Sequence, residues 1–199
     1  MNPVLAIGVV LLVLGVSMGL VSVTPLSAEA RRKLTHVAMG LVTFTFPWLF
    51  ASAWPVLLLG VLALGWFGAV SLSAALHARF GAALGERGSR GAFWFVCGVA
   101  LTFVLSDGDA AAYGVAILVL TLADAAAALV GKRFGRTRKS FEGSTAFFVV
   151  AFLVSAAALQ AYIAALAVAL AATVVEAAFG NGVDNLLVPL AVLAVLPLV

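Results

Sequence analysis

Residues 143–175, GSTAFFVVAFLVSAAALQAYIAALAVALAATVV, contain no charged side chain over 33 positions. A helix of about 20 apolar residues is enough to cross the hydrocarbon core of a bilayer. The stretch is therefore too long for one ordinary span, and the glutamine inside it, Gln160, predicts a hairpin between two short helices. The chain is thus expected to fold around helices that lie in lipid.

The rest of the chain has the same character. Of its 199 residues, 65% are hydrophobic and 10% are charged, whereas soluble domains are roughly half apolar and about a quarter charged. We therefore expect a single all-α integral membrane domain over residues 1–199, surrounded by membrane lipids and with no nucleic acid as a partner. The single cysteine, Cys97, excludes an internal disulfide.

Charged residues, prolines and glycines divide the chain into eight expected membrane spans, with seven as the alternative if residues 143–175 form one helix. The eight spans are 4–22, 35–50, 55–76, 91–106, 110–131, 143–159, 161–175 and 186–199. The polar stretches His77–Arg90 and Lys132–Glu142 are expected to be loops.

All 11 basic residues lie in three stretches that alternate along these spans. The stretches contain Arg31, Arg32 and Lys33; Arg79, Arg87 and Arg90; and Lys132, Arg133, Arg136, Arg138 and Lys139. The positive-inside rule predicts that the three stretches are cytoplasmic and that the N-terminus is outside. With eight spans the turn Asn181–Asn185 is also cytoplasmic, whereas with seven it faces outward.

Asp124 lies within the expected span 110–131. A carboxylate near mid-membrane costs about 2.5–3.5 kcal/mol. The helix face that contains Asp124 also contains Thr121, Ala128 and Gly131, at spacings of three and four residues. Because these residues are small or polar, the face is better suited to line a cavity than to contact lipid. The alternative is a structural ion pair with a neighbouring helix.

Two further polar residues enter the membrane near the cytoplasmic side. Glu176 lies at the end of the seventh span, where the alternative is an interfacial acid. His36 follows Lys33 by three positions and precedes Gly40 by four, which places a polar and small face on one side of that helix. We regard both residues as candidates for a site.

The segment 131–144, GKRFGRTRKSFEGS, combines five cations with three glycines. Glycine allows close approach of the backbone to a ligand, and lysine and arginine neutralise phosphate oxygens, so the segment predicts a polyphosphate site. Gly143 and Ser144 are expected to open the next helix, whose N–H groups can point at an anion. Nearby acids suggest Mg²⁺, with Asp124 as the first choice of ligand. The alternative is a basic loop that only anchors the protein.

Four motifs, in the same order, resemble the phytol kinase, farnesol kinase and dolichol kinase family. They are EARRKLTHVAMG at 29–40, ADAAAALVGKRFG at 123–135, KSFEGS at 139–144, and Glu176 followed by Asp184, Asn185, Leu186 and Pro189. Members of that family are polytopic membrane enzymes that phosphorylate lipid alcohols, typically with CTP. The resemblance assigns to the nucleotide and phosphoryl-transfer site Arg32, Lys33, Asp124, Gly131, Lys139, Glu142 and Gly143.

The resemblance implies a kinase that transfers the γ-phosphate of cytoplasmic CTP to a polyprenol, phytol, farnesol or diacylglycerol in the bilayer. Asp124 or His36 would accept the hydroxyl proton, and Lys139 would stabilise the charge of the transferred group. The expected nucleotide contacts are Arg32, Lys33, Gly131, Lys132, Arg133, Gly135, Lys139, Ser140, Glu142, Gly143, Ser144 and Asn185. The expected Mg²⁺ ligands are Asp124, Glu142, Glu176 and Asp184.

The chain is short beside dolichol kinases and plant phytol kinases, so we expect a bacterial-like member in the cytoplasmic membrane of a prokaryote, with its active site on the cytoplasmic side. Two other functions remain open at this point. A phosphatidate cytidylyltransferase would use similar residues with CTP but release pyrophosphate. A small transporter coupled to protons or cations would use intramembrane acids such as Asp124 and Glu176.

Overall fold

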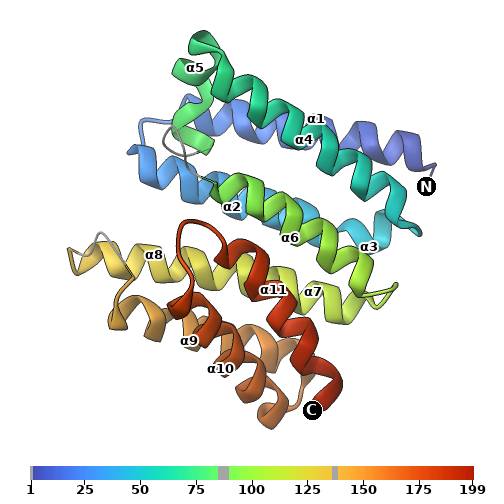
Figure 1. Ribbon diagram of the computed structural model, residues 1–199, viewed down its shortest axis with the longest axis vertical. Coiled ribbons are helices and arrows are strands. Elements are labelled where there is room, and N and C mark those ends of the chain that lie inside the picture. Colours follow the sequence, from blue (N-terminus) through green and yellow to red (C-terminus); the bar gives the residue numbers. More distant parts are fainter. Residues whose placement is uncertain (1, 85–89, 136–138) are drawn as a thin grey trace.

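The computed structural model describes residues 2–84, 90–135 and 139–199, and within these ranges all regular structure is helical (Figure 1). The expectation of an all-α fold is confirmed. The helices are α1 (Pro3–Ser22), α2 (Ala28–Phe44), α3 (Phe46–Leu49), α4 (Ala53–Leu72), α5 (Ala74–Leu84), α6 (Gly91–Leu105), α7 (Ala110–Leu118), η1 (Val119–Ala123), α8 (Asp124–Arg133), α9 (Phe141–Leu159), α10 (Tyr162–Ala178), α11 (Asp184–Val195) and η2 (Leu196–Leu198).

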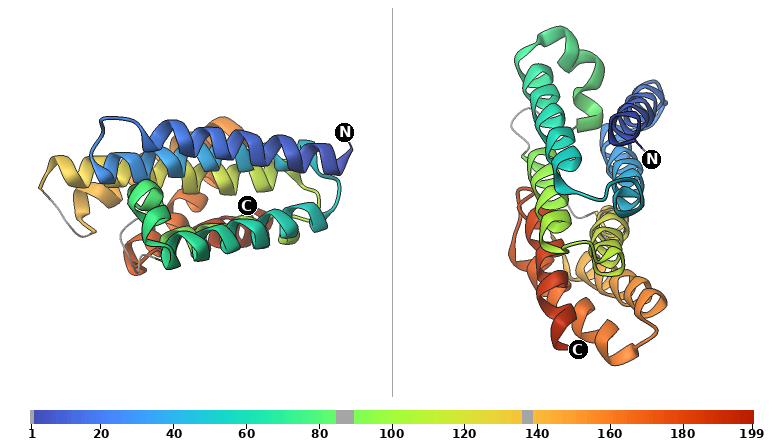
Figure 2. Two further views of the ribbon diagram at one scale, coloured as in Figure 1. Left: turned by 90° about the horizontal axis from the view of Figure 1, so that it is seen from above. Right: turned by 90° about the vertical axis from the view of Figure 1, so that its right-hand side faces the viewer.

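The long helices run side by side in two layers (Figure 2). One layer contains α4, α6 and α11, and the other contains α1, α2, the continuous rod of α7, η1 and α8, and then α9. Helix α10 packs against both α9 and α11 and connects the two layers at one edge, while α1 packs against α2 and α4 at the opposite edge. The rod is the most buried of the long apolar segments and forms the centre of the molecule.

The hairpin at Gln160 is confirmed. Gln160 follows the last residue of α9 with φ 52°, the left-handed conformation that commonly ends a helix. Helices α9 and α10 then pack closely against each other. The uncharged stretch therefore divides into two helices at the residue that the sequence indicated.

Among the described residues, four helical segments are long and apolar enough to cross a bilayer: α1, α4, the rod 110–133 and α9. Helices α6, α10 and the segment 184–198 are apolar but shorter. Each expected span overlaps a helix, but two bounds differ clearly. Helix α2 begins at Ala28 and ends at Phe44, so the expected span 35–50 also includes α3, and the expected span 55–76 passes the end of α4 at Leu72 into α5. The chain is a membrane protein, and the number of its crossings stays a prediction.

The expectation of a loop over His77–Arg90 is wrong for its first part, because α5 extends to Leu84. Its sequence, AALHARFGAAL, is rich in alanine and leucine, which are strong helix formers. The ring of Phe80 on α5 meets the ring of Trp66 on α4 edge-on, with centroids 5.5 Å apart. Basic residues Arg87, Arg136 and Arg138 lie outside the described residues.

Gly40 allows close contact between α2 and the rod. A side-chain carbon placed on Gly40 would lie 2.8 Å or less from three side-chain atoms of Thr121. Only glycine permits this approach, and it fixes the distance between α2 and the segment that leads into Asp124.

Candidate functional site

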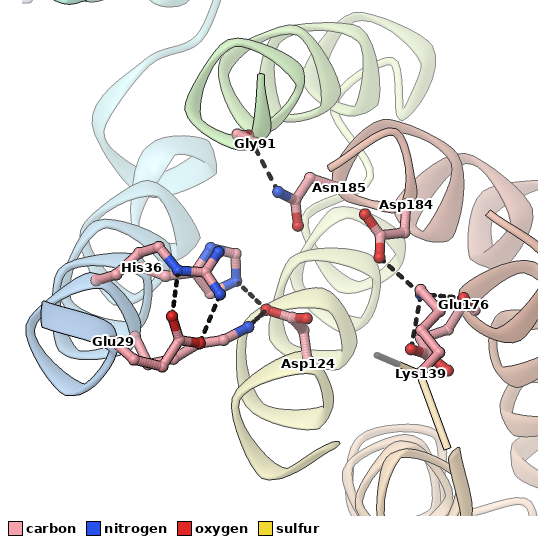
Figure 3. A network of polar contacts seen from close by, with 10 residues as sticks. Glu29, His36, Gly91, Asp124, Lys139, Glu176, Asp184 and Asn185 are labelled. Carbon is pink, nitrogen blue, oxygen red and sulfur yellow. Dashed lines mark hydrogen bonds and ion pairs between the residues drawn. The ribbon is translucent and has the colours of Figure 1, made fainter. Parts of the chain in front are cut away.

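Asp124 is the first residue of α8, directly after the one-turn π-helix η1. Single π turns inside α-helices are rare, and they occur frequently at functional sites because they change the direction of the side chains that follow. In this protein the carboxylate of Asp124 points toward α2 (Figure 3). Its side chain is only 18% exposed.

Two basic residues of α2 meet this carboxylate. Lys33 Nζ donates a hydrogen bond of 2.7 Å to Asp124 Oδ2, and His36 Nε2 lies 3.5 Å from the same oxygen. The side chains of Lys33 and His36 are 10% and 12% exposed. The structure thus brings together three residues that the sequence singled out, across 91 positions of the chain.

Arg32 lies beside this cluster. Its Nε and Nη2 donate to the two carboxylate oxygens of Glu29 at 2.9 and 2.6 Å, a two-pronged pair within one turn of α2. The charges of Asp124 and Asp184 also attract Arg32. Arg32 is therefore within electrostatic reach of acids on both α8 and α11.

A second cluster forms around Lys139, just before α9. Its Nζ donates to Glu176 Oε1 at 2.7 Å, to Asp184 Oδ2 at 2.8 Å and to the backbone carbonyl of Glu176 (Figure 3). Ser144 Oγ donates to the other carboxylate oxygen of Glu176 at 3.0 Å. The end of α10 and the start of α11, 37 and 45 positions further along the chain, therefore meet at one cation.

The charge of Lys139 follows from these contacts. Burial acts most strongly and lowers its pKa, but the hydrogen bonds to Asp184 and Glu176 together outweigh burial and hold the pKa above its ordinary value. The amino group is therefore a cation at neutral pH. Because it is 30% exposed, it remains accessible from the end of the bundle.

Asn185 links α11 to α6. Its side-chain nitrogen donates to the carbonyl of Gly91 at 3.0 Å (Figure 3). In the preceding turn, Gly182 has φ 84°, and a side-chain carbon there would lie 2.4 Å from the Cα of Gly91. The expected nucleotide contact Asn185 thus also holds the turn that positions Asp184.

The basic segment begins on a helix. Lys132 and Arg133 form the last turn of α8 and are exposed, as is Gly135, whose φ is 69°. Gly131 is buried near Ser140 Oγ. The charge of Lys132 is within electrostatic reach of Glu29 on α2.

Helix α9 begins at Phe141, two residues before the expected start at Gly143. Ser140 is its N-cap, and Ser140 Oγ accepts from the backbone N–H of Gly143 at 3.1 Å. That N–H is thus used inside the protein. Gly143 also packs against the Ala127 carbonyl, and Glu142 lies half-buried in the first turn.

The expected Mg²⁺ ligands divide between the two clusters. Asp124 faces Lys33 and His36, whereas Glu176 and Asp184 converge on Lys139. Within residues 2–84, 90–135 and 139–199, no three His, Cys, Asp or Glu side chains are grouped for a metal. Magnesium commonly uses only one or two carboxylates together with phosphate and water. The two carboxylates and the carbonyl around Lys139 Nζ fit that donor chemistry.

Two features of the site had no signal in the sequence. The π turn before Asp124 contains neither glycine nor proline, the residues that usually mark irregular helix geometry. Phe95 of α6 meets the ring of His36 edge-on, with centroids 4.9 Å apart. A contact between two helices whose residues are 59 positions apart cannot be predicted from the spacing of residues along one chain.

Comparison with known proteins identifies one relevant relative. The chain is 32% identical over 182 residues to a protein of Synechocystis sp. described as phytol kinase, and the match covers 82% of this chain and 76% of the relative. Neither a protein-family model nor a solved structure matches the chain.

Proposed function

The chain belongs to the phytol kinase family, and from this premise we propose that it transfers the γ-phosphate of CTP to the hydroxyl group of a lipid alcohol such as phytol, farnesol, a polyprenol or a diacylglycerol. The observation that carries the proposal is the pair of charged clusters around Asp124 and Lys139 in an otherwise apolar bundle. Phosphoryl transfer requires mainly positioning and neutralisation of charge, which such clusters supply.

The nucleotide would lie over the basic segment. Lys132, Arg133 and Lys139 present cations there, and Arg32 adds a fourth from α2. Gly131, Gly135 and Gly143 leave the backbone free of side chains, and Ser140, Ser144 and Asn185 provide polar groups near the phosphates. The choice of CTP over ATP rests on the family resemblance.

Glu176 and Asp184 would hold Mg²⁺, with Glu142 and Asp124 as further candidates. The ion would neutralise phosphate charge and orient the γ-phosphate. Lys139 would leave the two carboxylates when the metal is bound and contact phosphate oxygens instead. Its exposed position at the start of α9 permits such a movement.

The alcohol would approach from the bilayer with its hydroxyl beside the middle of α2, at His36. Asp124 or His36 would accept the hydroxyl proton as the oxygen attacks the γ-phosphorus. Lys33 holds the Asp124 carboxylate in place with a hydrogen bond of 2.7 Å and balances its negative charge. We expect the active site to face the cytoplasm of a prokaryotic cell, because the basic segments gather there.

The proposal is tested with purified protein, Mg²⁺ and a panel of phytol, farnesol, polyprenols, diacylglycerol and phosphatidate. CTP labelled at the γ-phosphate should transfer label to an alcohol, and CTP labelled at the α-phosphate should not. Transfer of α-label to phosphatidate with release of pyrophosphate would instead show a cytidylyltransferase. Absence of labelled lipid with every acceptor would contradict both enzymes and favour a transporter.

A further inference from the structure

A half-open cavity of about 440 Å³ lies between α1, α2, α4 and α6. Its walls are almost wholly apolar and include Leu14, Met39, Leu59 and Phe95. Helices α1 and α4, which contribute most of its walls, form the edge of the bundle farthest from α9 and α10 (Figure 1). Of the described residues of the basic segment, 131–135 and 139–144, none lines it.

The size of the cavity argues against a packing defect. Protein interiors are packed about as densely as organic crystals, and voids much larger than a water molecule are few. Pockets that bind small molecules typically measure about 300–1,000 Å³ and are mainly apolar. The cavity therefore has the size and lining of a ligand site.

Two glycines keep the cavity open. A side-chain carbon on Gly15 of α1 would meet nothing within 4 Å, and one on Gly60 of α4 would meet only Val96, at 3.5 Å. Both glycines line the cavity. An added carbon would therefore fit at either position, and a larger side chain there would occupy open volume.

The ring of Phe95 lies between the cavity and the charged cluster. This residue is in the cavity wall, and its ring meets the ring of His36 edge-on at 4.9 Å. Met39, another wall residue, follows His36 by one turn of α2. His36 in turn lies 3.5 Å from Asp124. The apolar cavity and the charged cluster are therefore neighbours across one aromatic ring.

We propose that this cavity binds the hydrocarbon chain of the lipid alcohol, with the hydroxyl group at His36 and Asp124. The inference rests on the proposed kinase function and adds the place where the chain of the substrate lies. A lipid alcohol has one small polar end and a long apolar body, which is the shape and polarity of the site. Gly15 and Gly60 would then determine how long or branched a chain is accepted.

The first test compares Gly15→Leu with Gly8→Leu. Both glycines are exposed positions of α1 with nothing within 4 Å of an added carbon, but only Gly15 lines the cavity. Gly15→Leu should lower kcat/KM for C20 alcohols at least about ten-fold relative to a C10 alcohol, since pockets discriminate at the level of single methylenes. Gly8→Leu should leave that ratio unchanged. An unchanged ratio in Gly15→Leu, or an equal change in both variants, would overturn the proposal.

The second test does not depend on catalysis. A C15 prenyl alcohol that carries a diazirine is photolysed with the protein, and labelled peptides of α1, α4 and α6 are mapped by mass spectrometry. The proposal is supported if wall residues are labelled, if excess phytol suppresses this labelling, and if the labelling decreases in Gly15→Leu. This result would stand even if no acceptor is phosphorylated and the kinase proposal fails. Labelling that excess phospholipid suppresses equally well would assign the cavity to ordinary bilayer lipid. Labelling spread over the outer surface would also refute the proposal.

Discussion

Lys33 Nζ and Asp124 Oδ2 lie 2.7 Å apart, and the two side chains are 10% and 18% exposed. The pair joins α2 to α8. Two opposite charges at this depth stabilise each other, but either one alone would be an uncompensated buried charge. Both catalysis and stability should therefore respond to changes at this pair.

We predict that Asp124→Asn lowers phosphoryl transfer by about 10²–10⁴-fold, because a general base or a metal ligand is worth that much. The same change should lower stability in detergent by about 3–5 kcal/mol, because Lys33 loses its counterion. Thermal unfolding monitored by circular dichroism, and transfer of γ-labelled phosphate, measure the two effects.

A double variant separates these effects. Lys33→Met with Asp124→Asn removes both charges, so the melting temperature should recover most of its loss while activity stays low. Asp107→Asn is the matched control, since Asp107 is an exposed acid with φ 46°, a conformation that asparagine tolerates. Near wild-type activity of Asp124→Asn would contradict the site. A loss in His36→Gln as large as that in Asp124→Asn would identify histidine as the base.

The sequence predicted the apolar helices and the hairpin at Gln160 because both depend on local composition. It also identified Asp124, Lys33, His36 and Lys139 as polar groups that need partners. It did not show which partners they have, since the pairing of Lys139 with Glu176 and Asp184 depends on how α9, α10 and α11 pack. Tertiary packing also decides the π turn before Asp124.

The ion pair reverses the expected effect of Asp124→Asn on stability. A buried carboxylate without a partner predicts that asparagine is tolerated or even stabilising, because a neutral amide costs less than a charge. With Lys33 at 2.7 Å the sign reverses. Likewise, His77 and Arg79 favour a loop from residue 77 onward, but the alanines and leucines around them form α5.

Removal of divalent cations should abolish transfer. EDTA should stop the reaction, and Mg²⁺ should restore it. Glu176→Gln should raise the Mg²⁺ concentration for half-maximal rate more than about ten-fold, because one of two converging carboxylates loses its charge. KM for the alcohol should change little, since the cavity lies away from α10. A normal Mg²⁺ dependence in Glu176→Gln would exclude this residue as a ligand.

The transmembrane topology is tested with single cysteines in a Cys97→Ala background. Phe134→Cys and Phe179→Cys are suitable because both side chains are exposed, and Phe179 avoids the φ of 56° at Asn181. With eight crossings, both cysteines should react with a membrane-impermeant maleimide only from the cytoplasm. Ser52→Cys should react only from outside. Labelling of position 179 from outside would support seven crossings.

The last prediction concerns the contact between Gly40 and Thr121. Gly40→Ala would place a carbon within 2.8 Å of the Thr121 side chain, including its Cβ, so α2 and η1 must separate. Overpacking of this kind typically costs about 1–3 kcal/mol. The shift should also increase the distance between the side chains of Lys33 and Asp124. Activity should therefore fall by more than the loss of stability alone would cause. Gly68→Ala is the control, because an added carbon there meets nothing within 4 Å and alanine favours the helix. Equal melting temperatures and equal activities of the two variants would show that the close approach of α2 to the rod does not position the site.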